Sequence, residues 1–274
     1  MRMFRFRSPC SGRGSAVDAS RPSRRLAARP DDAKGTVASR RLNRIAPLVS
    51  AERYLQIGVQ KGKTLEAVVV VDRVGVDPQP MFDSAVLPSG VAFFAVPSDD
   101  YFSGLDAEAT FDLVFVDGLH EYRQSYRDVI HALAHLAPRG AVLIDDVVPT
   151  SAVAAIPDLQ QAHQAAKRAG ETLGDWMGDV FRTALALATL HPELEARTIV
   201  DDDGRAQMLV WRAENVAAAP SGCEASLQAS TDRLDELSAV TFEALFAQGV
   251  PSALRPGSLA EILDQFRMRD AGTA

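Results

Sequence analysis

Long apolar runs are absent from this sequence of 274 residues, and cysteine and aromatic residues are scarce. No apolar run reaches about 18 residues, so no transmembrane helix and no membrane partner are expected. The two cysteines, Cys10 and Cys223, lie far apart and indicate neither a disulfide framework nor a zinc site. Their scarcity fits a reducing cytosol, and a cytoplasmic location is predicted.

Basic residues are scarce outside the N-terminus. Residues 1–45 hold twelve Arg or Lys against three Asp, about +9, whereas the whole chain carries −7. The rest therefore carries about −16, which argues against nucleic acid as a partner because little positive charge remains to neutralise phosphates. Residues 1–36 lack apolar periodicity and are predicted to be disordered. An organellar transit peptide and a tail without function both fit their composition.

The most informative motif is a short apolar run that ends in a glycine turn. Tyr54–Ile57 leads into Gly58-Val-Gln-Lys-Gly62, and the next apolar run ends with Asp77. In an open α/β sheet such a turn lies at the carboxyl end of a strand, against a helix N-terminus, where ligands bind. An acidic side chain after the next strand can accept the hydroxyls of a ribose. A nucleoside-containing cofactor is the leading hypothesis, and plain turn chemistry is the alternative.

The glycine spacing argues against a dinucleotide. The dinucleotide fingerprint is G-x-G-x-x-G, whereas Gln60 stands in the middle of this turn. A nicotinamide-dependent oxidoreductase is therefore the less favoured reading.

Residues 53–147 alternate between apolar runs and helical patterns, which predicts a doubly wound, mostly parallel α/β sheet. An amphipathic helix is predicted over 125–136, ended by Pro138-Arg-Gly140. Two β-rich runs at 197–200 and 207–211 flank an acidic, Gly-containing turn and predict an antiparallel hairpin. The expected parallel strands are Tyr54–Ile57, Val69–Val76 or only its second half, Val91–Val96, Leu113–Val116 and Ala141–Ile144.

Three carboxylates and a histidine follow the last two of these strands. Asp117 ends the fourth strand, His120 comes three residues later, and Asp145 and Asp146 end the fifth. Neighbouring strands lie about 4.8 Å apart, so the carboxylates form a cluster that needs protons or cations to offset its repulsion. A divalent ion such as Mg²⁺ is one solution, and loop capping or pairing with Arg or Lys is the other. His120 is the candidate base, although it can also serve only to order the loop.

Four motifs in this order resemble those of class I S-adenosylmethionine (SAM)-dependent methyltransferases. Within that superfamily the chain is similar to the metal-dependent O-methyltransferase branch that includes macrolide-sugar enzymes such as macrocin O-methyltransferase. The resemblance covers residues 40–212 and implies a Rossmann-like, seven-stranded sheet that ends in the hairpin. Gln56 departs from the family, which has Glu or Asp at that position. The motifs are Tyr54–Val59, Gly75–Pro78, Phe111–His120 and Leu143–Asp146.

The resemblance implies a site for SAM and for a divalent cation, Mg²⁺ or another. Gly58 and Gly62 would admit the methionine part, Asp77 would hold the ribose, and the pair at 98–99 would contact adenine unless it is a solvated loop. The implied cofactor-binding residues are Gly58, Gly62, Thr64, Asp77, Ser98 and Asp99. The implied metal ligands are Asp117, Asp145 and Asp146, with His120 as the catalytic base.

The expected organisation is a methyltransferase domain over 37–215, with a cap-like insertion at 148–180 that encodes acceptor choice, and a helical extension over 222–270. The cap includes an aromatic-Gly-Asp string around Trp176 that either walls the acceptor pocket or packs in the core. The expected reaction is methyl transfer to a hydroxyl of a sugar or other small hydroxylated metabolite, because a vicinal diol chelates a metal well. A homo-oligomer is possible. A noncatalytic nucleoside-binding or scaffold protein on the same fold is the alternative.

Overall fold

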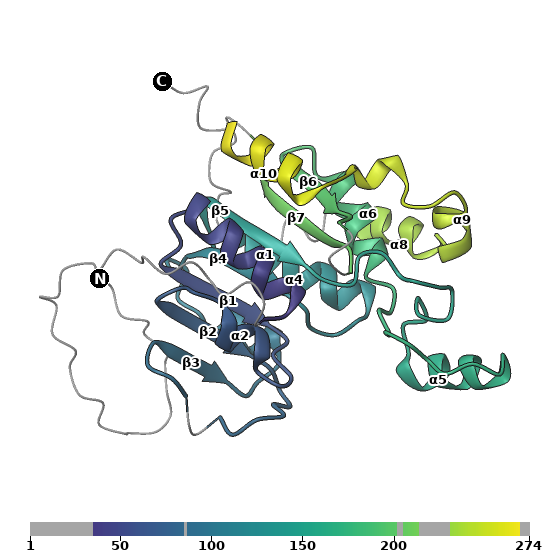
Figure 1. The fold of residues 1–274 in the computed structure, drawn as a ribbon, viewed down its shortest axis with the longest axis horizontal. Coiled ribbons are helices and arrows are strands. Elements are labelled where there is room, and N and C mark those ends of the chain that lie inside the picture. The colour runs from purple at the N-terminus through teal and green to yellow at the C-terminus, as the bar shows by residue number, and fades with distance from the viewer. Residues whose placement is uncertain (1–34, 85–86, 202–204, 214–230, 269–274) are drawn as a thin grey trace, which may run out of the picture.

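The structure is a computed structural model that describes residues 35–84, 87–201, 205–213 and 231–268 (Figure 1). Both cysteines, most of the predicted disordered tail and the centre of the predicted hairpin turn lie outside these ranges. The strands are β1 (Arg53–Ile57), β2 (Asp72–Val76), β3 (Val91–Phe94), β4 (Phe111–Val116), β5 (Leu136–Ile144), β6 (Leu194–Ile199), β7 (Gln207–Arg212) and β8 (Pro256–Gly257). The helices are α1 (Val37–Ile45), α2 (Lys63–Ala67), α3 (Ser98–Gly104), α4 (Tyr122–Ala134), α5 (Leu159–Arg168), α6 (Phe181–Leu190), α8 (Thr231–Ser238), α9 (Phe242–Phe246) and α10 (Leu259–Met268), with short 3₁₀ turns at Ala46–Leu48 and Ser252–Leu254.

The strands of the described residues form one sheet in the order β3-β2-β1-β4-β5-β7-β6-β8. Strands β1 to β5 pair parallel with one another, and β7 pairs antiparallel with both β5 and β6. The predicted fold class, a mostly parallel doubly wound sheet with a terminal antiparallel hairpin, is confirmed. The short strand β8, which pairs parallel with β6, adds an eighth strand that the sequence did not indicate.

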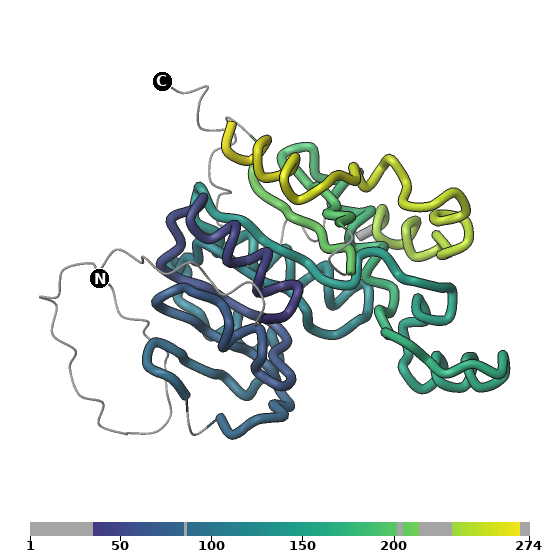
Figure 2. Tube along the Cα trace, viewed as in Figure 1, coloured from purple at the N-terminus to yellow at the C-terminus, as the bar shows by residue number. Residues whose placement is uncertain are grey.

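Helices cover both faces of this sheet. One face carries α3, α4, α6 and α8, whose buried residues join those of the strands in one apolar cluster. The other face carries α1, α2 and α10, and Trp211 of β7 packs edge-on against Phe266 of α10. The first and last described helices, purple and yellow in Figure 2, thus lie on the same face of the sheet.

Strand β2 covers 72–76, the second half of the predicted run 69–76. Other element boundaries differ from the prediction: β3 ends at Phe94 and β5 already begins at Leu136. Helix α4 begins at Tyr122 because the Glu121 side chain accepts hydrogen bonds from the N–H groups of Arg123 and Gln124. It ends at Ala134, before the predicted end, because Leu136 already pairs with Phe111 of β4, so Pro138 to Gly140 lie in β5.

The segment after β5 leaves the sheet before it returns as α6. It contains α5, which stands away from the sheet in Figure 1 and buries only Ala162 and Ala166. Backbone N–H groups of Met177 and Gly178 both donate to the carbonyl of Ala154, so the two ends of this excursion are tied together. No helix among the described residues is long and apolar enough to cross a membrane.

Candidate functional site

The parallel strands end level with one another, which aligns the residues that follow them. Ile57 of β1 is in register with Val76 of β2 and with Val116 of β4. Val116 is in turn in register with Ile144 of β5. Gly58, Asp77, Asp117 and Asp145, each the first residue after its strand, therefore form a row along the carboxyl edge of the sheet.

The glycine turn after β1 passes directly against the end of β4. Gly58 has φ +79°, and a Cβ placed on it would lie 1.8 Å from the carbonyl oxygen of Asp117. No other residue fits there, since both the backbone conformation and the space demand glycine. The turn is thereby held close to the carboxylate cluster. Gly62, which also has positive φ, is the N-cap of α2.

Asp77 organises the glycine turn. Its Oδ2 accepts hydrogen bonds from the N–H groups of Val59 and Gln60, each at 2.8 Å, and its Oδ1 accepts one from Gln79 at 2.7 Å. Hydroxyls of a ribose would share or replace these bonds. The predicted ribose residue therefore also fixes the backbone that the cofactor is predicted to approach.

The Gln56 side chain also stabilises the glycine turn by hydrogen bonding. Its Nε2 donates to the carbonyl of Gly58 at 2.8 Å, and its Oε1 accepts from the hydroxyl of Tyr54 at 3.0 Å. An amide supports the backbone here without supplying charge. Thr64 points elsewhere: its hydroxyl lies 2.8 Å from that of Thr36, the N-cap of α1.

The predicted adenine pair lies at the start of α3 and contacts α4. Ser98 Oγ donates to Oδ1 of Asp128 at 2.6 Å, and Gln124 Nε2 donates to the same oxygen at 2.9 Å. Asp99 accepts from Arg127 Nε at 3.1 Å. Burial raises the pKa of Asp128 to about 6, against the lowering effect of the Ser98 and Gln124 hydrogen bonds.

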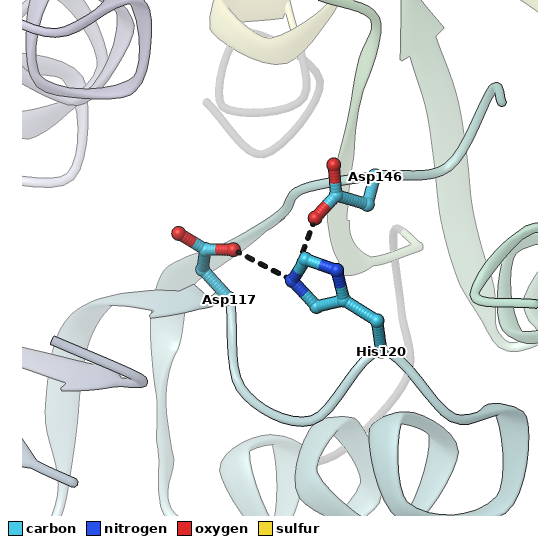
Figure 3. Close-up of side chains that lie close together, drawn as sticks. All are labelled: Asp117, His120 and Asp146. Carbon is cyan, nitrogen blue, oxygen red and sulfur yellow. Dashed lines mark ion pairs between the residues drawn. The ribbon is translucent and has the colours of Figure 1, made fainter. Parts of the chain in front are cut away.

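Asp117, His120 and Asp146 converge at the carboxyl ends of β4 and β5 (Figure 3). His120 Nε2 lies 2.9 Å from Oδ2 of Asp146 and 3.6 Å from Oδ1 of Asp117. One ligand atom from each residue lies within 4.8 Å of the other two, so these three side chains can hold a metal ion together. Asp146 has φ +60°, a left-handed conformation that is uncommon for a residue other than glycine.

The segment 176–179 fixes the orientation of His120. Its Nδ1 donates to the carbonyl of Trp176 at 3.0 Å, and the two rings stack with centroids 4.8 Å apart. Gly178 has φ +59°, and a Cβ on it would lie 1.7 Å from the carbonyl oxygen of His120. The next residue, Asp179, accepts from the N–H of Tyr122 at 2.7 Å. The cap is therefore seated directly on the β4–α4 loop.

Hydrogen bonds to carboxylates make His120 a cation in this arrangement. Burial lowers the pKa of His120. The hydrogen bonds to Asp117 and Asp146 raise it by more than burial lowers it, so the pKa is about 10. Both ring nitrogens then donate, which matches the carbonyl on one side and the carboxylates on the other. Burial, with the negative charges of Asp117 and Asp146, raises the pKa of Asp145 to about 7.

Asp145 does not belong to the three-residue group, although it was predicted as a metal ligand. Its Oδ1 accepts the backbone N–H of Asp146 at 2.9 Å and thus braces the turn after β5. The described donor set is two carboxylates and one imidazole. Such a set fits a divalent cation that takes mixed oxygen and nitrogen ligands, whereas Mg²⁺ prefers oxygen alone.

Arg205, just before β7, is a member of the site that the sequence reasoning missed. Its guanidinium lies 3.2 Å from Oδ1 of Asp146. A usable signal was present: the antiparallel pairing of Ile144 with Met208 brings the residues before β7 beside the end of β5. The predicted alternative, that the acidic residues pair with Arg or Lys, thus describes Asp146 in part.

A cavity of about 390 Å³ opens at the opposite edge of the sheet. Its lining includes Arg53, Asp72, Val91 and Phe111, the first residues of β1, β2, β3 and β4. It is therefore separate from the candidate site, which lies where these strands end.

Comparison with known proteins finds one family model that resembles the central segment. Residues 55–147 match the family model described as "Methyltransferase domain". No curated protein matches the sequence. The match runs from within β1 to the end of β5 and contains every predicted site residue.

The chain is also similar to solved structures. One is the SAH-bound methyltransferase PaMTH1 from Podospora anserina, with 16% identity over 68% of this chain and 82% of that chain and a TM-score of 0.47. Another is the O-methyltransferase TomG from Streptomyces achromogenes in complex with SAM, with 23% identity over 62% and 77% and a TM-score of 0.43. A third is the O-methyltransferase from Bacillus cereus in complex with SAH, with 16% identity over 62% and 79% and a TM-score of 0.43.

Proposed function

We propose that this protein is a SAM-dependent methyltransferase that moves a methyl group to a hydroxyl of a sugar or other small hydroxylated metabolite, with the help of a divalent cation. One observation carries the proposal. The glycine turn and Asp77 lie in one row with Asp117, at the sheet edge where His120 and Asp146 meet, inside the segment that matches a methyltransferase domain.

The cofactor would lie along this row. S-adenosylmethionine supplies a methyl group on a positively charged sulfur. The turn at Gly58 admits its methionine part against the backbone, and Asp77 accepts hydrogen bonds from its ribose. Ser98 and Asp99 would border the adenine. The carboxylates of the cluster face the same edge, so they would also favour a cationic sulfur electrostatically.

His120 is the residue proposed to take the proton of the acceptor hydroxyl. The Trp176 carbonyl keeps a proton on Nδ1, which leaves Nε2 as the nitrogen directed at Asp117 and Asp146. In this role Nε2 has to be free of its proton: a divalent cation held by Asp117 and Asp146 would lower the pKa of His120, and the neutral Nε2 would then take the proton of the acceptor hydroxyl. The stacked Trp176 ring restricts the rotation of His120 throughout.

The divalent cation would be held by Asp117 and Asp146, with His120 as a third ligand or as the neighbouring base. Such an ion would lower the pKa of a bound acceptor hydroxyl. Asp145 would support this arrangement from the turn rather than as a ligand. The proposed relationship of this chain is to the macrocin-like branch of the superfamily, whose resemblance implies a metal site of this kind.

The acceptor would enter between the cluster and the cap at 148–180. Trp176 is half-buried and its indole N–H is already used by the carbonyl of Ile156, so the ring offers an apolar wall. A sugar can stack one face on such a wall while two hydroxyls reach the cluster. A catechol-like acceptor is the less favoured alternative.

The first test is calorimetric titration with S-adenosylhomocysteine and, as a control, with NAD, each with and without Mg²⁺ or Mn²⁺. Micromolar binding of S-adenosylhomocysteine without binding of NAD supports the proposal. If neither binds, the cofactor assignment is wrong and a noncatalytic role gains support.

The second test is methyl transfer to a panel of sugars and hydroxylated metabolites. His120→Gln is expected to lower kcat by about 100-fold or more, the usual contribution of a general base. Glu236→Gln, at an exposed position on α8 away from the proposed site, is the control and should behave like the wild type. Asp117→Ala is expected to abolish any metal dependence, and methyl transfer that keeps its metal dependence in this variant would disprove the metal site.

A further inference from the structure

Asp146 is contacted by basic side chains of the chain at both of its carboxylate oxygens. Oδ2 takes the hydrogen bond from His120 Nε2 at 2.9 Å, and Oδ1 lies 3.2 Å from the guanidinium of Arg205. The Asp146 side chain is only 3% exposed, whereas that of Arg205 is 42% exposed. The guanidinium thus reaches a buried carboxylate from the solvent side.

The backbone of Arg205 is held in place by a second arginine. Arg41 of α1 donates from one guanidinium nitrogen to the carbonyl of Arg205 at 2.8 Å and to Oε1 of Gln207 at 3.0 Å. Arg41 is 1% exposed. The buried Arg41 on α1 therefore fixes the main chain before β7, while the Arg205 side chain that leaves this main chain is partly exposed.

These contacts make the Arg205 side chain the movable part of the site. Its neighbours Arg41 and Gln207 are buried, and Asp146 is confined by its left-handed backbone and by His120. Only the Arg205 guanidinium can leave Asp146 without carrying a charge into the protein interior. Its departure would free Oδ1 for another cation.

We propose that Arg205 is a built-in counter-cation that competes with the divalent cation for Asp146. The inference rests on the proposed metal-assisted function. In the arrangement described, the guanidinium neutralises Asp146 and repels a second cation at the same oxygen. When a divalent cation binds, the guanidinium moves into solvent, where its long side chain can remain hydrated. Arg205 therefore lowers the affinity of the cluster for metal. When no metal is bound, it compensates the negative charge of Asp146.

The test is calorimetric titration of Mn²⁺ into the full chain without cofactor or acceptor. Four proteins are compared: the wild type, Arg205→Gln, Arg205→Lys and Arg233→Gln. The last is the charge-matched control, because Arg233 is exposed on α8 and pairs there with Glu236. We expect Arg205→Gln to bind Mn²⁺ roughly tenfold more tightly than the wild type, as loss of one partly screened positive charge predicts. Arg205→Lys and Arg233→Gln should stay within about threefold of the wild type.

Each outcome decides the inference. Tighter binding in Arg205→Gln alone supports it, and a smaller difference at high salt would be expected of an electrostatic competition. Equal affinity in all four proteins overturns it while the metal site stands. Absence of Mn²⁺ binding in all four overturns both the inference and the metal part of the proposed function. Binding of S-adenosylhomocysteine, measured on the same samples, reports separately whether the cofactor assignment holds.

Discussion

Replacement of Asp128 by Asn is expected to stabilise the protein at neutral pH. Asp128 is 1% exposed, and burial raises the pKa of its carboxyl from an ordinary 3.8 to about 6. This difference corresponds to a cost of about 3 kcal/mol for keeping the carboxylate ionised in the folded state. Asparagine at this position keeps an oxygen that can accept the hydrogen bonds from Ser98 and Gln124, but it never ionises.

The sign of the pH dependence follows from the raised pKa. Below about pH 4 both the folded and the unfolded chain hold the proton, so the cost is absent. As the pH rises from about 4 to 6 the unfolded chain releases the proton first, and this group removes stability from the folded state. Above about pH 6 the full cost remains. We expect Asp128→Asn to be about 1 to 3 kcal/mol more stable than the wild type at pH 8, with a difference near zero at pH 4.

The assay is urea denaturation at several pH values between 4 and 8. A gain of this size also raises Tm by several degrees, since about 1 kcal/mol shifts Tm by roughly 2 to 4 °C in a domain of this length. Asp100→Asn, at an exposed position on α3, removes the same charge and serves as the control. The reasoning is refuted if Asp128→Asn is no more stable than wild type at pH 8, or if its advantage is the same at every pH.

Three further substitutions test other parts of the structure. Gly58→Ala places a Cβ 1.8 Å from the Asp117 carbonyl oxygen, and should destabilise the fold by about 3 kcal/mol or more in denaturant titration; a wild-type midpoint would contradict the described turn. Gly178→Ala places a Cβ 1.7 Å from the His120 carbonyl oxygen, and the displaced cap should lower kcat/KM by about 100-fold while binding of S-adenosylhomocysteine is kept. If kcat/KM and the affinity for S-adenosylhomocysteine fell by the same factor, the cap would support the cofactor rather than His120. Tyr126→Phe removes the 2.6 Å hydrogen bond to buried His191 and should cost about 1 to 3 kcal/mol in thermal unfolding, with no effect on kcat.

The carboxyl edge of the sheet was predictable because apolar runs and turns report directly on buried parallel strands. The runs that end at Ile57 and Val116 are mostly apolar and stop at a glycine or an aspartate, so the residues after them were placed correctly at the strand ends. Chain order alone then brought Asp117 close to the end of β5. The start of α4 was missed because it depends on a side-chain cap at Glu121, which the apolar pattern does not register.

The composition of the three-residue group was less predictable because it depends on single backbone torsions. Asp146 adopts φ +60° and joins His120, whereas its neighbour Asp145 braces the turn. Nothing in two adjacent aspartates distinguishes these roles. Arg205 was missed for a similar reason, since its approach to Asp146 requires the register of β7 against β5 and the tether to Arg41.

Because the strand ends are aligned, the position of the strand-end residues and the structure of the cap at 148–180 can change independently. The residues that directly follow the strands, Gly58, Asp77, Asp117 and Asp145, are positioned by main-chain pairing of β1, β2, β4 and β5. The cap rests on this frame through a few contacts around Trp176, Gly178 and Asp179. Under the proposed function, an exchanged or redesigned cap that preserves those contacts is expected to change the acceptor preference while the strand-end residues stay in place.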